Sequence, residues 1–129
     1  MKQKQTVEDY LKTIYILSKN KRVHGSDIAE KLNVSRPTVS ASLKALEKEG
    51  YLITNDLHEI YLTEHGKVIA QDTYDRHQMF KNMLLKIGVD EKTASKDACK
   101  MEHALSSESY AALKKYIESI MEHPNYDDK

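Results

Sequence analysis

The sequence predicts a mainly α-helical protein, in which an N-terminal winged helix-turn-helix with a two-stranded wing is followed by a second, helical domain. Only four Gly and two Pro occur in 129 residues, so the chain contains few helix breakers. Apolar residues recur at helical spacing over most of the chain. Residues 51–54 and 59–62 instead read as two short strands directly after three helical segments. We place the two domains at residues 1–72 and 73–129.

The first domain contains recognisable helix boundaries. Thr6 is expected to begin the first helix, with Asp9 closing a capping box three residues later. Asn33 is expected to end the second helix, at a turn that needs positive φ. Ser35 is a good N-cap for the third helix, and Gly50 a good terminator. The loop between the strands forms the tip of the wing.

The second half is predicted to be entirely helical. A long helix follows Thr63 and runs to about residue 86, where Gly88 breaks the pattern. Asp90 is expected to cap a helix that extends to about residue 103 or 104, and Ser106 or Ser107 is expected to cap the last helix. The polar tail, residues 125–129, is expected to fray.

The charges are distributed unevenly although the net charge is zero. Residues 1–50 carry ten Lys and Arg against six Asp and Glu, whereas residues 51–129 carry ten against fourteen. A basic front half suits a polyanion, and an acidic rear half suits cations. We find neither a signal peptide nor an apolar stretch of the ~20 residues that span a membrane. Cys99 is the only cysteine, so no intrachain disulfide forms and a cytoplasmic location is expected.

Residues 25–44 fit a DNA-reading helix-turn-helix. Ala29 is small enough for two helices to approach, and Val39 sits where the second packs against the first. The exposed face of the second helix offers short hydroxyl side chains and two cations, which can reach base edges and phosphates. These candidate DNA-binding residues are Ser35, Arg36, Pro37, Thr38, Ser40, Ser42 and Lys44. A helical hairpin with a merely solvated polar face is the simpler alternative, but the wing that follows favours double-stranded DNA as partner.

A second group of residues predicts a metal site. Cys99, Glu102 and His103 have the spacing i, i+3, i+4, which places a thiol, a carboxylate and an imidazole on one helix face. All three bind divalent transition metals. A further ligand must come from elsewhere, and Asp9 and His77 are the candidates.

Each candidate ligand also has an ordinary structural interpretation. Cys99 could be a small buried apolar residue, and Glu102 a solvated charge. His103 could close a helix end, where the helix dipole favours it. Asp9 could be only a capping residue, and His77 could pair with a carboxylate of its own helix.

Taken together, these motifs resemble the family of the diphtheria-toxin repressor and the manganese transport regulator. The resemblance covers residues 6 to about 121, and its most specific part is the segment 97–103. Other recognisable segments are residues 8–15, 35–40, 76–77 and 87–90. It implies a helical dimerisation domain and a homodimer. The chain departs from longer members in ending after that domain, so we expect their third, SH3-like domain to be absent. By position, it implies the primary metal ligands Asp9, Cys99, Glu102 and His103, and assigns His77 to an ancillary site.

The implied metal site is a hybrid of two types within that family. Asp9 matches manganese-type members, whereas Cys99 matches iron-type members. Lys12 and Lys81 stand where relatives place carboxylates, which argues against a second ion bound through His77. Since a thiolate favours borderline metals, we expect Fe(II), with Mn(II) next.

The resulting hypothesis is a metal-dependent transcriptional regulator, a repressor of metal-uptake genes that binds palindromic operator DNA as a homodimer. One ion held by Asp9 and the rear cluster would set the distance between two recognition helices. The alternative is a metal-independent winged-helix regulator that responds to another ligand. We expect no enzymatic activity, because nothing Gly-rich near Cys99 offers an oxyanion hole. A winged helix that binds only protein would show no steep salt dependence with DNA.

Overall fold

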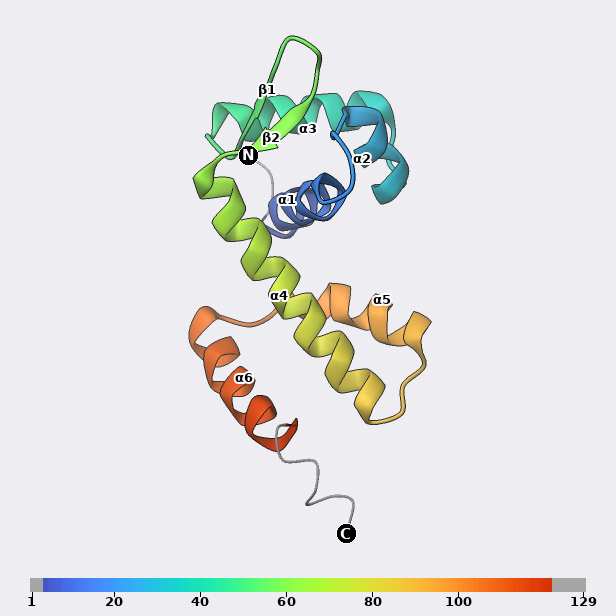
Figure 1. The fold of residues 1–129 in the computed structure, drawn as a ribbon, viewed down its shortest axis with the longest axis vertical. Helices are drawn as coiled ribbons and strands as arrows, with labels where there is room; N and C mark the ends of the chain where they lie inside the picture. The colour runs from blue at the N-terminus through green and yellow to red at the C-terminus, as the bar shows by residue number, and fades with distance from the viewer. Residues whose placement is uncertain (1–3, 122–129) are drawn as a thin grey trace. The chain divides into compact units, whose positions relative to one another are not determined.

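The computed structural model describes residues 4–121, and only the backbone of residue 121 is described. The chain divides into two compact units. Unit 1 extends to Tyr74 and unit 2 begins at Asp75, within one continuous helix, α4. Figure 1 shows the course of the chain through both units. The expected fraying of residues 125–129 lies outside the described residues. No helix among the described residues is both long and apolar enough to span a membrane.

Unit 1 is a winged helix-turn-helix, as the sequence predicts. Its elements before α4 are α1 (Lys4–Ser18), α2 (Gly25–Leu32), α3 (Arg36–Lys48), β1 (Leu52–Thr54) and β2 (Ile60–Leu62). The two strands pair antiparallel, with Ile53 opposite Tyr61. The backbone N–H of Ile60 also donates to the carbonyl of Val23 at 2.8 Å, so the wing is tied to the α1–α2 connection.

The boundaries of α2 and α3 follow from local chemistry. Asn33 ends α2 in the left-handed region at φ 56°, a conformation that Asn tolerates better than most residues. Ser35 caps α3, where its hydroxyl accepts the N–H of Thr38, and Pro37 lies in the first turn. Gly50, at φ 86°, turns the chain into β1.

Helix α1 begins earlier than the capping pattern suggests. It is already helical at Lys4, so Thr6 lies inside the helix and the predicted capping box with Asp9 is wrong. Lys4 and Gln5 are good helix formers, and the ion pair from Lys4 to Glu8 adds a weak i, i+4 contact. Asp9 therefore lies beyond the first turn, which removes its interpretation as a capping residue.

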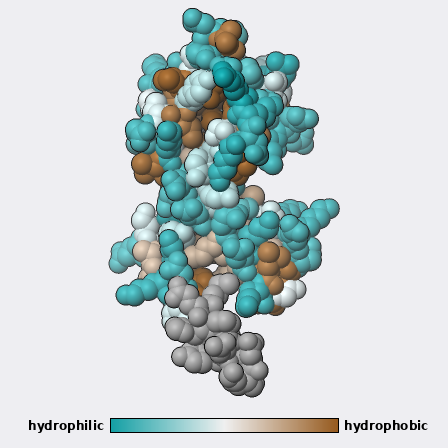
Figure 2. Space-filling view, in the orientation of Figure 1, coloured by the Kyte–Doolittle hydropathy of each residue, from teal (hydrophilic) through white to brown (hydrophobic). Residues whose placement is uncertain are grey.

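The core of unit 1 forms where α1, α2, α3 and the wing base meet. The apolar residues exposed by 1% or less are Leu11, Ile14, Ile28, Val39, Leu46, Leu52 and Ala70. Burying a side chain of this size contributes about 1.5–3 kcal/mol each. On the face drawn in Figure 2, hydrophilic side chains cover most of each unit's surface, and apolar ones form separate patches.

Unit 2 contains the second half of α4 (Glu64–Lys86), followed by α5 (Glu91–Met101) and α6 (Ser107–Met121). Its core centres on Phe80, Ala98 and Tyr110, with methionines and leucines packed around them. Gly88 ends α4 at φ 102°. Asp90 and Ser106 cap the next two helices through hydrogen bonds from backbone N–H groups, as predicted. Helix α5 ends at Met101, two or three residues before the predicted end.

Candidate metal centre and nucleic-acid interface

Glu102 is the centre of a buried cluster in unit 2. It follows the last residue of α5, but its backbone remains helical, and its N–H still donates to the carbonyl of Ala98. Because the helical backbone continues through Glu102, its side chain stays on the same face as that of Cys99, three positions earlier, although α5 ends at Met101. The residue is 1% exposed, so the alternative interpretation as an ordinary solvated charge is wrong. A buried carboxylate needs partners that replace water.

Two imidazoles supply those partners, one on each carboxylate oxygen. His77 Nδ1 lies 2.9 Å from Oε1 of Glu102, and His103 Nε2 lies 3.2 Å from Oε2. His77 comes from α4, whereas His103 directly follows Glu102 in the chain. Both side chains are largely covered, with 11% and 6% exposed, respectively. Glu102 thus bridges the two histidines. The partner of His77 is therefore a carboxylate outside α4, not one of its own helix.

The thiol of Cys99 lies beside the same pair. Its Sγ is 3.7 Å from Nδ1 of His77, and the cysteine is exposed, not a buried apolar residue. The ligand atoms of His77, Cys99 and Glu102 all lie within 4.8 Å of one another. Ligands of one ion lie about 2.0–2.3 Å from it, hence at most about 4.6 Å apart. This donor set fits a borderline divalent metal with little rearrangement.

Arg76 supports the cluster from the residue next to His77, a role that the sequence analysis missed. Its Nη1 donates to the carbonyl of Leu105 at 2.6 Å and lies 3.5 Å from that of Glu102. The guanidinium also lies over the ring of Tyr110, 4.6 Å from its centroid. Arg76 therefore holds the connection between α5 and α6, from which Glu102 and His103 project.

Asp9, the remaining predicted ligand, belongs to unit 1. It lies on α1, partly buried, one position before the core residue Tyr10. Within unit 2, the structure brings together the other four predicted ligands through Glu102. The grouping of His77 with Cys99 could not be read from the sequence, because 22 positions separate the two.

The predicted DNA-reading surface lies on α3 in unit 1. Six of the seven candidates are exposed: Ser35, Arg36, Pro37, Thr38, Ser40 and Lys44. Ser42 is 1% exposed, so its assignment to the exposed face is wrong. The physical reason is helical periodicity, because Ser42 lies three residues after Val39 and four before Leu46, and both are buried.

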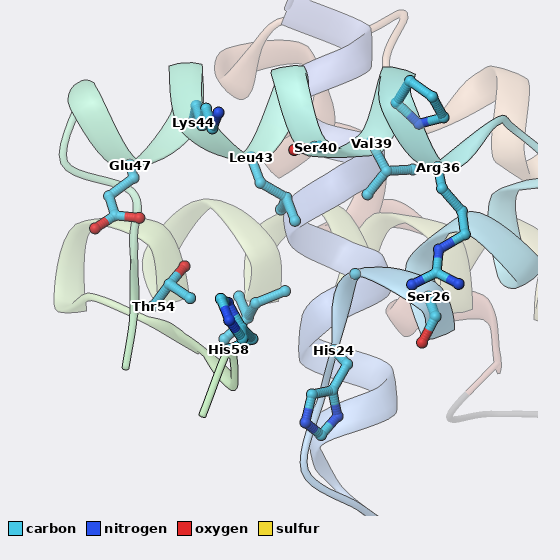
Figure 3. Close-up of a pocket in the computed structure, with 13 residues that line it drawn as sticks. His24, Ser26, Arg36, Val39, Ser40, Leu43, Lys44, Glu47, Thr54 and His58 are labelled. Carbon is cyan, nitrogen blue, oxygen red and sulfur yellow. The ribbon is translucent and has the colours of Figure 1, made fainter. Parts of the chain in front are cut away.

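An open cavity of about 700 Å³ lies between α3, the start of α2 and the wing. Arg36, Ser40 and Lys44 line it from α3, and His24 and Ser26 from the start of α2. His58 lines it from the wing, below α3 in Figure 3. Besides apolar side chains and the carboxylate of Glu47, the cavity is bordered by hydroxyl, imidazole and cationic side chains, which are groups that contact DNA backbones and base edges.

The fold and the two groups of residues define a winged-helix protein with a cluster of side chains that are able to bind a metal. The profile of the iron-dependent repressor N-terminal DNA-binding domain matches residues 3–70. The profile of the corresponding metal-binding and dimerisation domain matches residues 63–129. The chain belongs to the iron-dependent repressor family, whose relatives are metal-dependent transcriptional regulators.

Individual relatives agree with this assignment. The chain is 39% identical over 119 residues to an HTH-type transcriptional regulator of Methanocaldococcus jannaschii, covering 90% of this chain and 95% of that one. It is 32% identical to the HTH-type transcriptional regulator MntR of Lysinibacillus sphaericus, covering 93% and 87%, respectively. Among solved structures, the manganese regulator SloR superposes with a TM-score of 0.75 at 28% identity, over 92% of this chain. The chain spans only 54% of the length of that protein.

Proposed function

We propose that this protein is a metal-responsive transcriptional repressor of metal-uptake genes, acting as a homodimer on palindromic double-stranded DNA. The observation that carries the proposal is the buried Glu102 carboxylate, shared by two histidines with a thiol alongside. A protein with no use for a metal has little reason to enclose a carboxylate between two imidazoles beside a thiol. The family membership supports the DNA-binding and dimerising parts.

In unit 2, we propose four ligands, which are His77, Cys99, Glu102 and His103. The family resemblance, rather than any distance, adds Asp9 from unit 1 as a further ligand. The bound ion would replace the proton-mediated contacts between Glu102 and its two imidazoles. Loading therefore depends on deprotonated ligands and weakens in acid.

Fe(II) is the ion that we propose first, with Mn(II) second. The thiol of Cys99 favours a borderline metal over the harder Mn(II). The relatives named for manganese, such as SloR, keep Mn(II) in consideration. Replacing Cys99 by Glu would give an all-oxygen and nitrogen donor set, and should shift the preference toward Mn(II). Anaerobic titrations of wild type and Cys99→Glu with both ions measure this directly.

For DNA, we propose that α3 enters the major groove through Ser35, Arg36, Pro37, Thr38, Ser40 and Lys44. Ser35 and Thr38 also bond to each other at 2.8 Å, which fixes their hydroxyls at the start of α3. Arg36 and Lys44 supply the positive charge that phosphates or guanine require. The two α3 helices of a dimer would then contact half-sites about one duplex turn apart, or a multiple of it.

The decisive experiment measures how metal changes DNA affinity. A duplex is first selected from a random-sequence pool by the wild-type protein loaded with Mn(II), or anaerobically with Fe(II). We expect that duplex to bind tightly with metal and weakly after chelation, whereas Asp9→Ala binds weakly in both conditions. Glu64→Ala, at an α4 side chain that is 93% exposed, is the control and should respond as wild type does. An affinity that chelation leaves unchanged would favour the metal-independent regulator.

A further inference from the structure

Glu59, at the base of the wing, is a nearly buried carboxylate that neither the metal ligands nor the α3 surface involves. The residue is 6% exposed. Its Oε1 accepts hydrogen bonds from Nδ2 of Asn55 at 2.8 Å and from the hydroxyl of Tyr61 at 3.1 Å. Nη1 of Arg22 lies 3.5 Å from each carboxylate oxygen. A carboxylate with these three partners has a fixed position.

Through Asn55, this carboxylate organises the loop at the tip of the wing. The side-chain Oδ1 of Asn55 accepts the backbone N–H groups of Leu57 and Glu59, both at 2.9 Å. The main chain of Asn55 exchanges further bonds with Glu59 and His58, each at 3.0 Å. His58 takes φ 61° inside this turn. The direction in which His58 projects is therefore set by the turn that Asn55 and Glu59 close.

The same carboxylate anchors the wing to the body of unit 1. Arg22 precedes Val23, whose carbonyl accepts the N–H of Ile60, the residue after Glu59. The strands β1 and β2 contain only three residues each. A two-stranded hairpin of that length has little stability of its own. Its orientation hence depends on contacts outside the strands, and the ion pair between Arg22 and Glu59 is one of them.

The wing that Glu59 fixes forms one wall of the cavity beside α3. His58 and Thr54 line that wall, opposite Ser40 and Lys44 on α3 (Figure 3). The width of the space available to a DNA strand depends on where this wall stands. Glu59 itself does not line the cavity.

We propose that Glu59 is a positioning residue for DNA binding, holding the wing so that His58 faces α3 across the cavity. This role rests on the proposed DNA-binding function. This role predicts a change in DNA affinity opposite to the one that charge alone predicts. Removing a carboxylate near DNA makes the protein more positive, which by charge alone strengthens binding to a polyanion. The positioning role predicts weaker binding instead.

The test uses the full chain, loaded with Mn(II) or anaerobically with Fe(II), and the duplex selected by the wild-type protein. Glu59→Gln and Asn55→Ala are each expected to lower its affinity by about tenfold, the effect of losing one charge-assisted hydrogen bond. The affinity for the metal ion should stay at the wild-type value in both variants, because neither substitution changes a proposed metal ligand. The amide hydrogens of Leu57 and Glu59 should exchange faster in both.

Glu64→Gln is the matched control, since it removes the same charge from a side chain that is 93% exposed in the same unit. It should bind DNA as tightly as wild type or slightly tighter. Asn55→Ala keeps the test decisive if Glu59→Gln folds poorly, because it opens the same turn with no change of charge. Wild-type or tighter DNA binding by folded Glu59→Gln, or by Asn55→Ala, overturns the positioning role alone. Failure of the metal-loaded wild type to select any duplex overturns the proposed function, and the positioning role with it.

Discussion

Ser40 and Ser42 lie two positions apart on α3 and have opposite surroundings. Ser40 is exposed and lines the cavity, whereas Ser42 is 1% exposed among the apolar side chains of the core. The hydroxyl of Ser42 has no hydrogen-bond partner among the described residues. A buried hydroxyl without a partner destabilises the fold, because it has lost its bonds to water.

Ser42→Ala is therefore expected to stabilise the protein, by roughly 1 kcal/mol, and to leave DNA affinity unchanged. Ser40→Ala is the matched partner, expected to weaken DNA binding without changing stability. Urea unfolding and titration with the selected duplex measure the two effects on the same preparations. If Ser42→Ala weakened DNA binding as much as Ser40→Ala, its hydroxyl would act in recognition despite its burial.

At the scale of elements, the junction between the wing and α4 depends on a close backbone approach. The hydroxyl of Thr63 accepts the N–H of Gly66 at 3.1 Å and donates to the carbonyl of Gly50 at 2.7 Å. The N–H of Thr63 donates to the carbonyl of Tyr51. A Cβ on Gly66 would overlap that same carbonyl oxygen. Gly66 is thus required by packing, since its φ is that of an ordinary helical residue.

Gly66→Ala is expected to destabilise the protein by about 2–3 kcal/mol, because the backbone of Tyr51 has to move. Lys67→Ala, at the exposed neighbouring position, should change stability by less than about 0.5 kcal/mol. Urea unfolding of both variants provides the comparison. Equal stability of Gly66→Ala and wild type would mean that α4 can shift away from the wing freely.

At the scale of the whole molecule, each of the two units has its own core and its own carboxylates with a lowered pKa. In unit 1, a hydrogen bond of 2.6 Å from Nζ of Lys21 to Oδ1 of Asp27 is the main cause of the lowered pKa of Asp27. The hydrogen bond from Asn55 is the main cause of the lowered pKa of Glu59. In unit 2, hydrogen bonds from Thr93 lower the pKa of Asp90. Each of these groups holds its proton less tightly when folded than when unfolded.

The stability of both units should therefore fall in acid. The contribution of these groups is complete above their ordinary pKa values of 3.8 and 4.5, and disappears as the pH falls through the lower folded values. We expect the urea midpoint to drop as the pH is lowered from about 5 to about 3. The double variant Asp27→Asn, Glu59→Gln should flatten this loss in unit 1, and hydrogen exchange resolved by segment assigns the effect. An unchanged slope would place the acid sensitivity in other groups.

The helices and the wing could be predicted from the sequence, because their determinants are local. Ser35, Asn33 and Asp90 cap or end helices through bonds to residues a few positions away, and the apolar spacing is carried by the chain itself. The predictions failed where a boundary depended on context. Helix α1 starts before Thr6, and α5 stops at Met101 although the i, i+3 relation of Cys99 to Glu102 persists.

The sequence by itself determined the succession of elements, the polar face of α3 apart from Ser42, and the set of residues able to bind a metal. Only the tertiary structure decided that Glu102 is buried between His77 and His103, that Arg76 braces their connection, and that Glu59 closes the wing. The physical reason is that the contacts of His77 with Glu102, of Arg76 with the α5–α6 connection and of Arg22 with Glu59 join residues 25 to 37 positions apart. Their geometry depends on how helices and strands pack, which local periodicity does not encode.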